Sequence, residues 1–123
     1  MSDNRNIAIL GASSNTERYA WMAQQLLRNH DYVVMPVSPV HSKVGDIATY
    51  TSLTTIIDPI HTVTVYVNPR HVEQYVDQLL QVKPQRVIFN PGSENPVAIQ
   101  RLRDAGIQVE LACTLVLLRT GQF

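Results

Sequence analysis

The sequence predicts an α/β fold in which five parallel strands form a doubly wound sheet, with the expected strand order 3-2-1-4-5. Short apolar runs alternate with stretches of helical periodicity about every 25 residues, a pattern typical of βαβ units. The first apolar run is followed by a turn of small residues and then by a helical pattern. The chain has 123 residues, 45% of them hydrophobic, so we expect one domain over residues 1–123.

Five apolar runs are the expected strands. The first run is continuous rather than alternating, as in strands that are buried on both faces. The second ends at Ser38-Pro39, because proline lacks a backbone donor and restricts the residue before it. The third is rich in β-branched residues, which favour strands. The runs cover residues 6–10, 33–37, 63–67, 86–89 and 107–111.

Helical spacing of apolar residues predicts the intervening helices. One helix is expected over residues 19–29, and a second begins at Asn68-Pro69, where a capping side chain precedes a proline. A third begins near Asn95-Pro96, directs Ala98, Leu102 and Ala105 inward, and ends at Gly106. The apolar tail, residues 112–123, is expected to form a short helix that packs on the domain or on a partner.

Charge and composition exclude several classes of protein. Lysine and arginine together number 10, as do aspartate and glutamate, so no strong basic field indicates a nucleic-acid partner. No apolar run reaches the roughly 18 residues that span a bilayer, so no membrane association is expected. The polar start, residues 1–5, does not resemble a secretory signal. With one cysteine, Cys113, the chain has no internal disulfide, and we expect a cytoplasmic protein.

Four loops follow the expected strands, and they should line one site, because ligands of such sheets bind at the carboxyl ends of the strands. The loops are Gly11–Arg18, Ser38–Lys43, Asn68–Arg70 and Asn90–Glu94. Backbone N–H groups in the first of these turns and the positive end of the following helix suit an anion. Arg18 and Lys43 suit a multiply charged phosphate ligand, although each could equally be a solvated surface charge.

The first turn departs from the known nucleotide-binding fingerprints. A dinucleotide site has three glycines, whereas residues 11–16 contain only Gly11. The second strand ends at Val37 without the carboxylate that holds a nicotinamide ribose. No Gly-Lys-Ser/Thr follows, so the turn is not a P-loop either. The histidines lack metal-site spacing and no catalytic triad or carboxylate pair is recognisable, so we predict neither a metal site nor catalytic residues.

Three motifs, in this order, give the chain a family resemblance. They are Gly11-Ala12-Ser13 followed by Arg18, then Pro36-Val37-Ser38-Pro39, then Asn90-Pro91-Gly92-Ser93-Glu94-Asn95. Together they resemble the small stand-alone CoA-binding domain proteins, which are similar to the N-terminal CoA-binding domain of the succinyl-CoA synthetase alpha subunit. The ligase members carry a second domain with a phosphorylated histidine, and we expect no such domain here. The resemblance therefore implies no ligase activity.

The resemblance implies a Rossmann-like sheet with CoA, or an acyl-CoA, lying across the strand ends. Residues expected near the phosphates are Gly11, Ala12, Ser13 and Ser14, with Arg18 as a nearby cation. Those expected to flank the adenosine and its 3′-phosphate are Pro39 and Lys43, and those along the nucleotide are Val67, Asn68 and Pro69. Those expected beside the pantetheine arm are Asn90, Pro91, Gly92 and Ser93.

Three hypotheses about function remain open at this stage. The first is a small CoA- or acyl-CoA-binding module without catalysis of its own, acting alone, as a homodimer or as a subunit of a partner enzyme. The apolar segment Leu115–Leu118 is the reason for expecting a homodimer. The second is an NAD(P)-linked or other nucleotide-dependent enzyme with a degenerate fingerprint. The third is an interaction module with a vestigial site.

Overall fold

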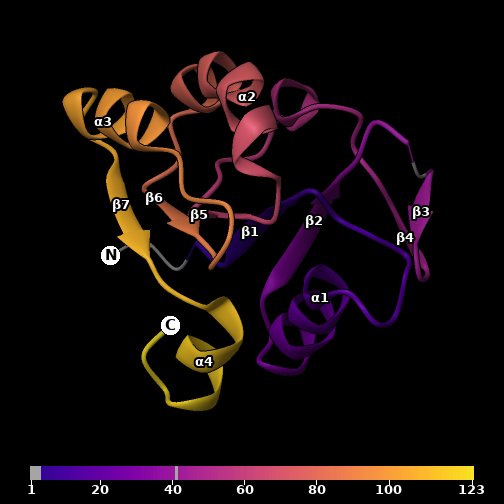
Figure 1. Cartoon of the computed structure of the whole chain (residues 1–123). Coiled ribbons are helices and arrows are strands. Elements are labelled where there is room, and N and C mark those ends of the chain that lie inside the picture. Colours follow the sequence, from indigo (N-terminus) through magenta and orange to yellow (C-terminus); the bar gives the residue numbers. More distant parts are fainter. Residues whose placement is uncertain (1–3, 41) are drawn as a thin grey trace.

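The protein is described by a computed structural model that covers residues 4–40 and 42–123 (Figure 1). The expectation that the N-terminus is not a secretory signal concerns residues 1–5, of which 1–3 lie outside the described residues. His41, in the second loop, also lies outside them. One five-stranded sheet forms the centre of the molecule. Its strands are β1 (Asn6–Leu10), β2 (Val33–Val37), β5 (Thr62–Val65), β6 (Arg86–Phe89) and β7 (Gln108–Leu111). The strands of the added two-stranded hairpin are β3 (Lys43–Val44) and β4 (Ile47–Ala48).

All neighbouring strands of the main sheet are parallel, which confirms the predicted class of fold. The strand order is β2-β1-β5-β6-β7, which differs from the expected 3-2-1-4-5 because the third strand of the main sheet in chain order, β5, lies beside β1. Residues Thr62–Val65 of β5 are all buried, so this strand occupies a central position, whereas Val33 of the edge strand β2 is 55% exposed. The chain passes from β1 to β2 in one direction across the sheet and from β5 to β7 in the other. The point of reversal in the sheet therefore lies between the neighbouring strands β1 and β5.

Helices cover both faces of the sheet, as a doubly wound fold requires (Figure 1). One face packs on helices α1 (Tyr19–Asn29) and α4 (Thr114–Arg119). The other packs on α2 (Pro69–Val82), α3 (Pro96–Asp104) and the short 3₁₀ helix η1 (Leu53–Thr55). Right-handed crossovers explain this separation, because the chain moves across the sheet in one direction before the reversal and in the other after it.

The first strand shows why its sequence is apolar without alternation. Ile7 and Ile9 belong to the core beneath α1 and α4, while Ala8 and Leu10 belong to the core beneath α2 and α3. A central strand of a parallel sheet is buried on both faces, so every position needs an apolar side chain.

The structure confirms the predicted starts of two helices at Asn68 and Asn95. Asn68 Oδ1 accepts a hydrogen bond from the backbone N–H of Arg70 at 3.0 Å. Asn95 Oδ1 accepts one from the backbone N–H of Ala98, also at 3.0 Å. A proline occupies the first turn of each helix, where its missing donor costs no intrahelical hydrogen bond.

Two element boundaries differ from the prediction in ways that affect the interior. Strand β5 ends at Val65 rather than at residue 67, so Tyr66 and Val67 leave the sheet. Helix α3 ends at Asp104, and Ala105 is exposed rather than directed inward. The chain turns at Gly106, whose φ of 82° places it in the region that favours glycine, and buried Ile107 follows it.

The apolar tail packs within the chain. Leu115 and Leu118 of α4 are 4% and 3% exposed, and Leu118 belongs to the core that contains Ile7 and Ile9. Burial inside the chain thus accounts for two of the three leucines in the segment Leu115–Leu118 that suggested a homodimer, and Val116 is the exposed apolar residue of this helix. The homodimer stays a prediction.

Candidate ligand-binding site

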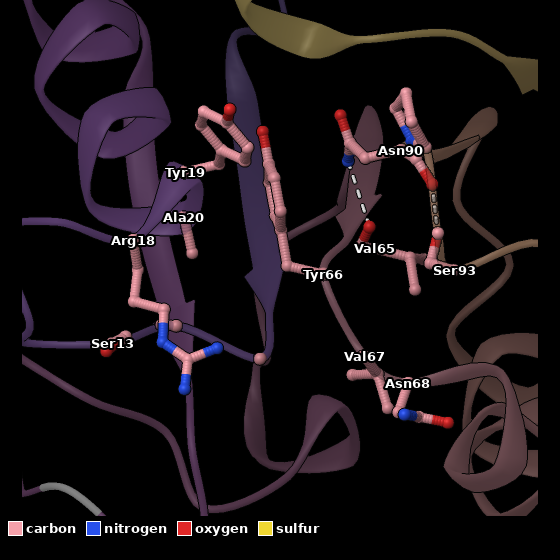
Figure 2. A pocket seen from close by; sticks show the side chains of 14 residues that line it. Ser13, Arg18, Tyr19, Ala20, Val65, Tyr66, Val67, Asn68, Asn90 and Ser93 are labelled. Carbon is pink, nitrogen blue, oxygen red and sulfur yellow. Dashed lines mark hydrogen bonds between the residues drawn. The ribbon is translucent and has the colours of Figure 1, made fainter.

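A pocket of about 490 Å³ opens at the carboxyl ends of β1, β5 and β6, where the chain reverses direction across the sheet (Figure 2). We call it the carboxyl-end pocket. Its walls come from the first turn, the start of α1, the segment after β5 and the turn after β6. The lining residues are Gly11, Ala12, Ser13, Arg18, Tyr19, Ala20, Val65, Tyr66, Val67, Asn68, Asn90, Pro91, Gly92 and Ser93.

Gly11 lets two walls of the pocket approach each other. Its φ is 90°, and a Cβ at this position would lie 2.9 Å from the backbone oxygen of Tyr66. No other residue type fits without displacing that backbone. The N–H groups of Gly11 and Ala12 both donate to the Val37 oxygen at 3.2 Å, so they join the first turn to β2.

The donors left for a ligand lie slightly further along the chain. Within the described chain, the backbone N–H groups of Ser13 and Ser14 have no hydrogen-bond partner. The first N–H groups of any helix lack intrahelical partners, and Arg18, at the N-cap of α1, provides no side-chain cap. Tyr19 and Ala20 bring this helix end to the pocket wall. The wall therefore carries backbone donors and a positive helix end, which suit an anion.

Arg18 supplies a full positive charge beside these donors. Figure 2 shows its guanidinium extending from the start of α1 toward the side of the pocket where Ser13 lies. Arg18 is exposed and forms no ion pair with the residues that the structure describes. An unpaired guanidinium beside open backbone donors favours a phosphate group as ligand.

Tyr66 and Tyr19 line the pocket, although the sequence did not point to them. The sequence placed Tyr66 inside a strand and Tyr19 at the start of a helix, and Tyr19 is 69% exposed. The Tyr66 hydroxyl is buried and has no hydrogen-bond partner of acceptable geometry in the described part of the chain. Burial raises the pKa of Tyr66 to about 12, against a smaller lowering by the hydroxyls of Thr114 and Thr64.

Asn90 lies at the pocket wall, but its side chain is committed to the structure. Its Nδ2 donates to Thr64 Oγ1 at 2.7 Å and to the Val65 oxygen at 2.9 Å. Its Oδ1 accepts from the backbone N–H of Thr114 at 2.8 Å. Asn90 is buried, and these bonds join β5, β6 and the start of α4. Ser93 Oγ donates to the Asn90 backbone oxygen at 2.7 Å and so fixes the turn after β6 (Figure 2).

Three of the four predicted loops contribute walls to this pocket, and the loop after β2 does not. Lys43 begins the β3–β4 hairpin, which packs against α1 through a hydrogen bond from Gln24 Nε2 to the Val44 oxygen at 3.1 Å. An ion pair of 2.9 Å between Arg28 and Asp46 adds to this contact. The predicted site residues outside the pocket walls are Ser14, Pro39, Lys43 and Pro69.

Two further findings concern other kinds of site. Over residues 4–40 and 42–123, no group of three or more histidine, cysteine, aspartate or glutamate side chains is placed to hold a metal ion. No helix in the same ranges is long and apolar enough to cross a membrane.

The fold and the pocket define a Rossmann-like domain with an anion-suited site at the carboxyl ends of its strands. The chain belongs to the CoA binding domain family, which matches residues 5–119. A crystal structure of an uncharacterized protein shares 35% identity with it over 99% of this chain and all of the other, with a TM-score of 0.92. A hypothetical protein from Pyrococcus horikoshii OT3 shares 29% identity over 96% of this chain and 84% of its own, with a TM-score of 0.90. The protein YneT of Bacillus subtilis, itself uncharacterized, is 23% identical over 84% of this chain and 76% of its own.

Proposed function

We propose that the carboxyl-end pocket binds CoA or an acyl-CoA and that the protein acts as a small binding module without catalysis of its own. The observation that carries this proposal is the unpaired guanidinium of Arg18 in the same pocket as the open backbone donor of Ser13 and the N-terminus of α1. Membership of the CoA binding domain family supports the choice of CoA among phosphate ligands.

In this proposal the diphosphate of CoA lies against the first turn and the start of α1. Arg18 and the N–H groups of Ser13 and Ser14 would then neutralise its charge. Val67 and Asn68 would border the nucleotide, and Pro91 and Gly92 would border the pantetheine arm. Pro39, Lys43 and Pro69 would contact parts of CoA that extend beyond the pocket.

The end of β2 favours CoA over NAD. The strand ends at Val37, and buried Ser38 follows it rather than a carboxylate. A nicotinamide cofactor loses the acidic partner of its ribose there, whereas a 3′-phosphate meets no repulsion.

The cellular setting is part of the same proposal. A single cysteine favours a reducing, cytoplasmic compartment. A homodimer or a partner enzyme subunit would give a binding module a route to influence metabolism, and Val116 and Leu111 are among the exposed apolar side chains available for such a contact.

Replacing the unpaired cation tests the proposal directly. Arg18→Gln should weaken CoA binding by about tenfold or more, because hydrogen bonds to charged groups contribute about 1.5–3 kcal/mol. Isothermal titration calorimetry at constant ionic strength measures this change. The matched control is Arg103→Gln, at an exposed arginine in the last turn of α3 that does not line the pocket, and this variant should bind CoA as the wild type does. Equal affinities in all three proteins would contradict the proposed role of Arg18.

A further inference from the structure

A second pocket, of about 390 Å³, lies at the opposite edge of the sheet. Its lining comes from the segments that enter β1, β2, β5 and β6, so it collects the amino ends of four parallel strands, and we call it the amino-end pocket. The lining residues that matter here are Arg5, Tyr32, His61, Gln85, Arg86 and Phe123. None of its lining side chains carries a carboxylate.

Two arginines of the amino-end pocket are held in place by aromatic rings. The Arg5 guanidinium carbon lies 4.0 Å from the centre of the Tyr32 ring, and that of Arg86 lies 4.5 Å from the centre of the Phe123 ring. The two rings meet edge to face, with centres 5.0 Å apart. The cations are therefore positioned before any ligand arrives, which reduces the entropy lost on binding.

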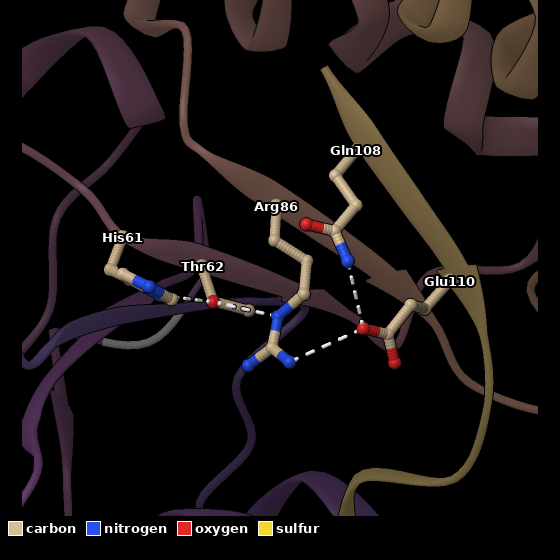
Figure 3. A network of polar contacts seen from close by, with 5 residues as sticks. All are labelled: His61, Thr62, Arg86, Gln108 and Glu110. Carbon is tan, nitrogen blue, oxygen red and sulfur yellow. Dashed lines mark hydrogen bonds and ion pairs between the residues drawn. The ribbon is translucent and has the colours of Figure 1, made fainter.

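Arg86 is buried and only partly neutralised. Its Nε donates to Thr62 Oγ1 at 3.1 Å, and its Nη1 meets Glu110 Oε1 at 3.4 Å (Figure 3). Within the described chain, its Nη2 has no hydrogen-bond partner. A guanidinium with one long carboxylate contact and an open Nη2 can still donate charge-assisted hydrogen bonds to an anion.

His61 adds a donor to the same pocket. Thr62 Oγ1 accepts a hydrogen bond from Arg86, so its own proton is available for His61 Nδ1, 2.7 Å away (Figure 3). This assignment leaves the proton of a neutral imidazole on Nε2. Burial lowers the pKa of His61, and the positive charge of Arg86 lowers it further, so the neutral ring is favoured. Arg86 is the charged group that acts on this ring, and Arg5 is the other cation of the pocket lining. An anion beside the ring would raise the pKa of His61 again.

We propose that the amino-end pocket binds a small metabolite through its carboxylate or phosphate group, independently of the CoA site. The lining offers N–H donors without partners in the described chain on Arg86, His61 and the Gln85 amide, with two fixed positive charges. Such a set matches a ligand that is rich in acceptors and negatively charged. The volume leaves room for a group larger than the oxyanion itself.

Titration with small anions, followed on the histidine rings by ¹H–¹⁵N NMR, tests this proposal. Inorganic phosphate and acetate are added separately, with chloride replaced so that the ionic strength stays constant. The His61 signals should change saturably with at least one anion, and the pKa of His61 should rise. His71, which is exposed on α2, is the internal control and should not respond. Saturation by phosphate alone or by acetate alone identifies which oxyanion the pocket takes.

Variants separate this pocket from general anion effects and from the CoA site. Arg86→Gln should weaken the response of His61 about tenfold or more. Arg5→Ala, at an exposed position that is less prone to disturb the fold, should weaken it about threefold, and Arg18→Gln should leave it unchanged. A non-saturable response shared by His61 and His71, or wild-type binding in Arg5→Ala and Arg86→Gln, would overturn the proposal without bearing on CoA binding.

Discussion

Two glycines of this protein differ in how strictly their surroundings require a glycine. Gly11 and Gly92 both have φ near 90°, but only Gly11 faces another backbone segment. A Cβ at Gly11 would lie 2.9 Å from the Tyr66 oxygen, whereas one at Gly92 would meet no atom within 4 Å. A substitution at Gly92 therefore introduces backbone strain alone, whereas a substitution at Gly11 introduces the same strain and a steric clash.

Gly11→Ala should destabilise the protein by about 3 kcal/mol or more, because about 1–2 kcal/mol of backbone strain adds to a clash of similar size. Gly92→Ala should cost only the strain, about 1–2 kcal/mol. Urea unfolding followed by circular dichroism measures both. Equal losses in the two variants would show that the approach of the first turn to Tyr66 is not as close as described.

At the scale of elements, the position of α4 depends on one buried side chain. Asn90 connects the start of α4 to β5 through three hydrogen bonds between 2.7 and 2.9 Å. Thr64 and Thr114 add a direct hydroxyl contact at 2.7 Å. A buried network of this kind stabilises only when its members are all satisfied.

Asn90→Ala should lower the free energy of unfolding by about 2–3 kcal/mol, because it leaves buried backbone groups of Thr114 and Val65 with fewer partners. Asn68→Ala is the matched control, since it removes an exposed helix cap and should cost about 1 kcal/mol. Equilibrium unfolding in urea compares the two. A smaller loss for Asn90→Ala than for Asn68→Ala would contradict the role assigned to the network.

Local sequence signals predicted the elements well and their arrangement less well. The continuous apolar run of β1 and the Asn-Pro starts of α2 and α3 are local features, so the sequence showed them. The place of β5 beside β1 depends on which neighbours bury it, and that information is spread over the whole sheet. The turns at Gly11 and Asn90 could be assigned to the site because they directly follow strands. Tyr66 was missed because the strand ends two residues earlier than its β-branched run indicates.

At the scale of the whole molecule, the parallel sheet has two chemically different edges. The carboxyl ends carry Arg18 and open backbone donors, and the amino ends carry Arg5 and Arg86 stacked on aromatic rings. No local motif in the sequence could have shown the second edge, because its residues precede four separate strands and include Phe123. The family and the arrangement of the first edge together support CoA as the ligand of the carboxyl-end pocket.

Calorimetric titration of the protein with CoA, 3′-dephospho-CoA and NAD tests the central claim most directly. We expect saturable binding of CoA, weaker binding of 3′-dephospho-CoA because a phosphate contact is lost, and weaker binding still of NAD because β2 ends without a carboxylate. A preference for NAD over CoA, or no binding of CoA at millimolar concentration, would contradict the account.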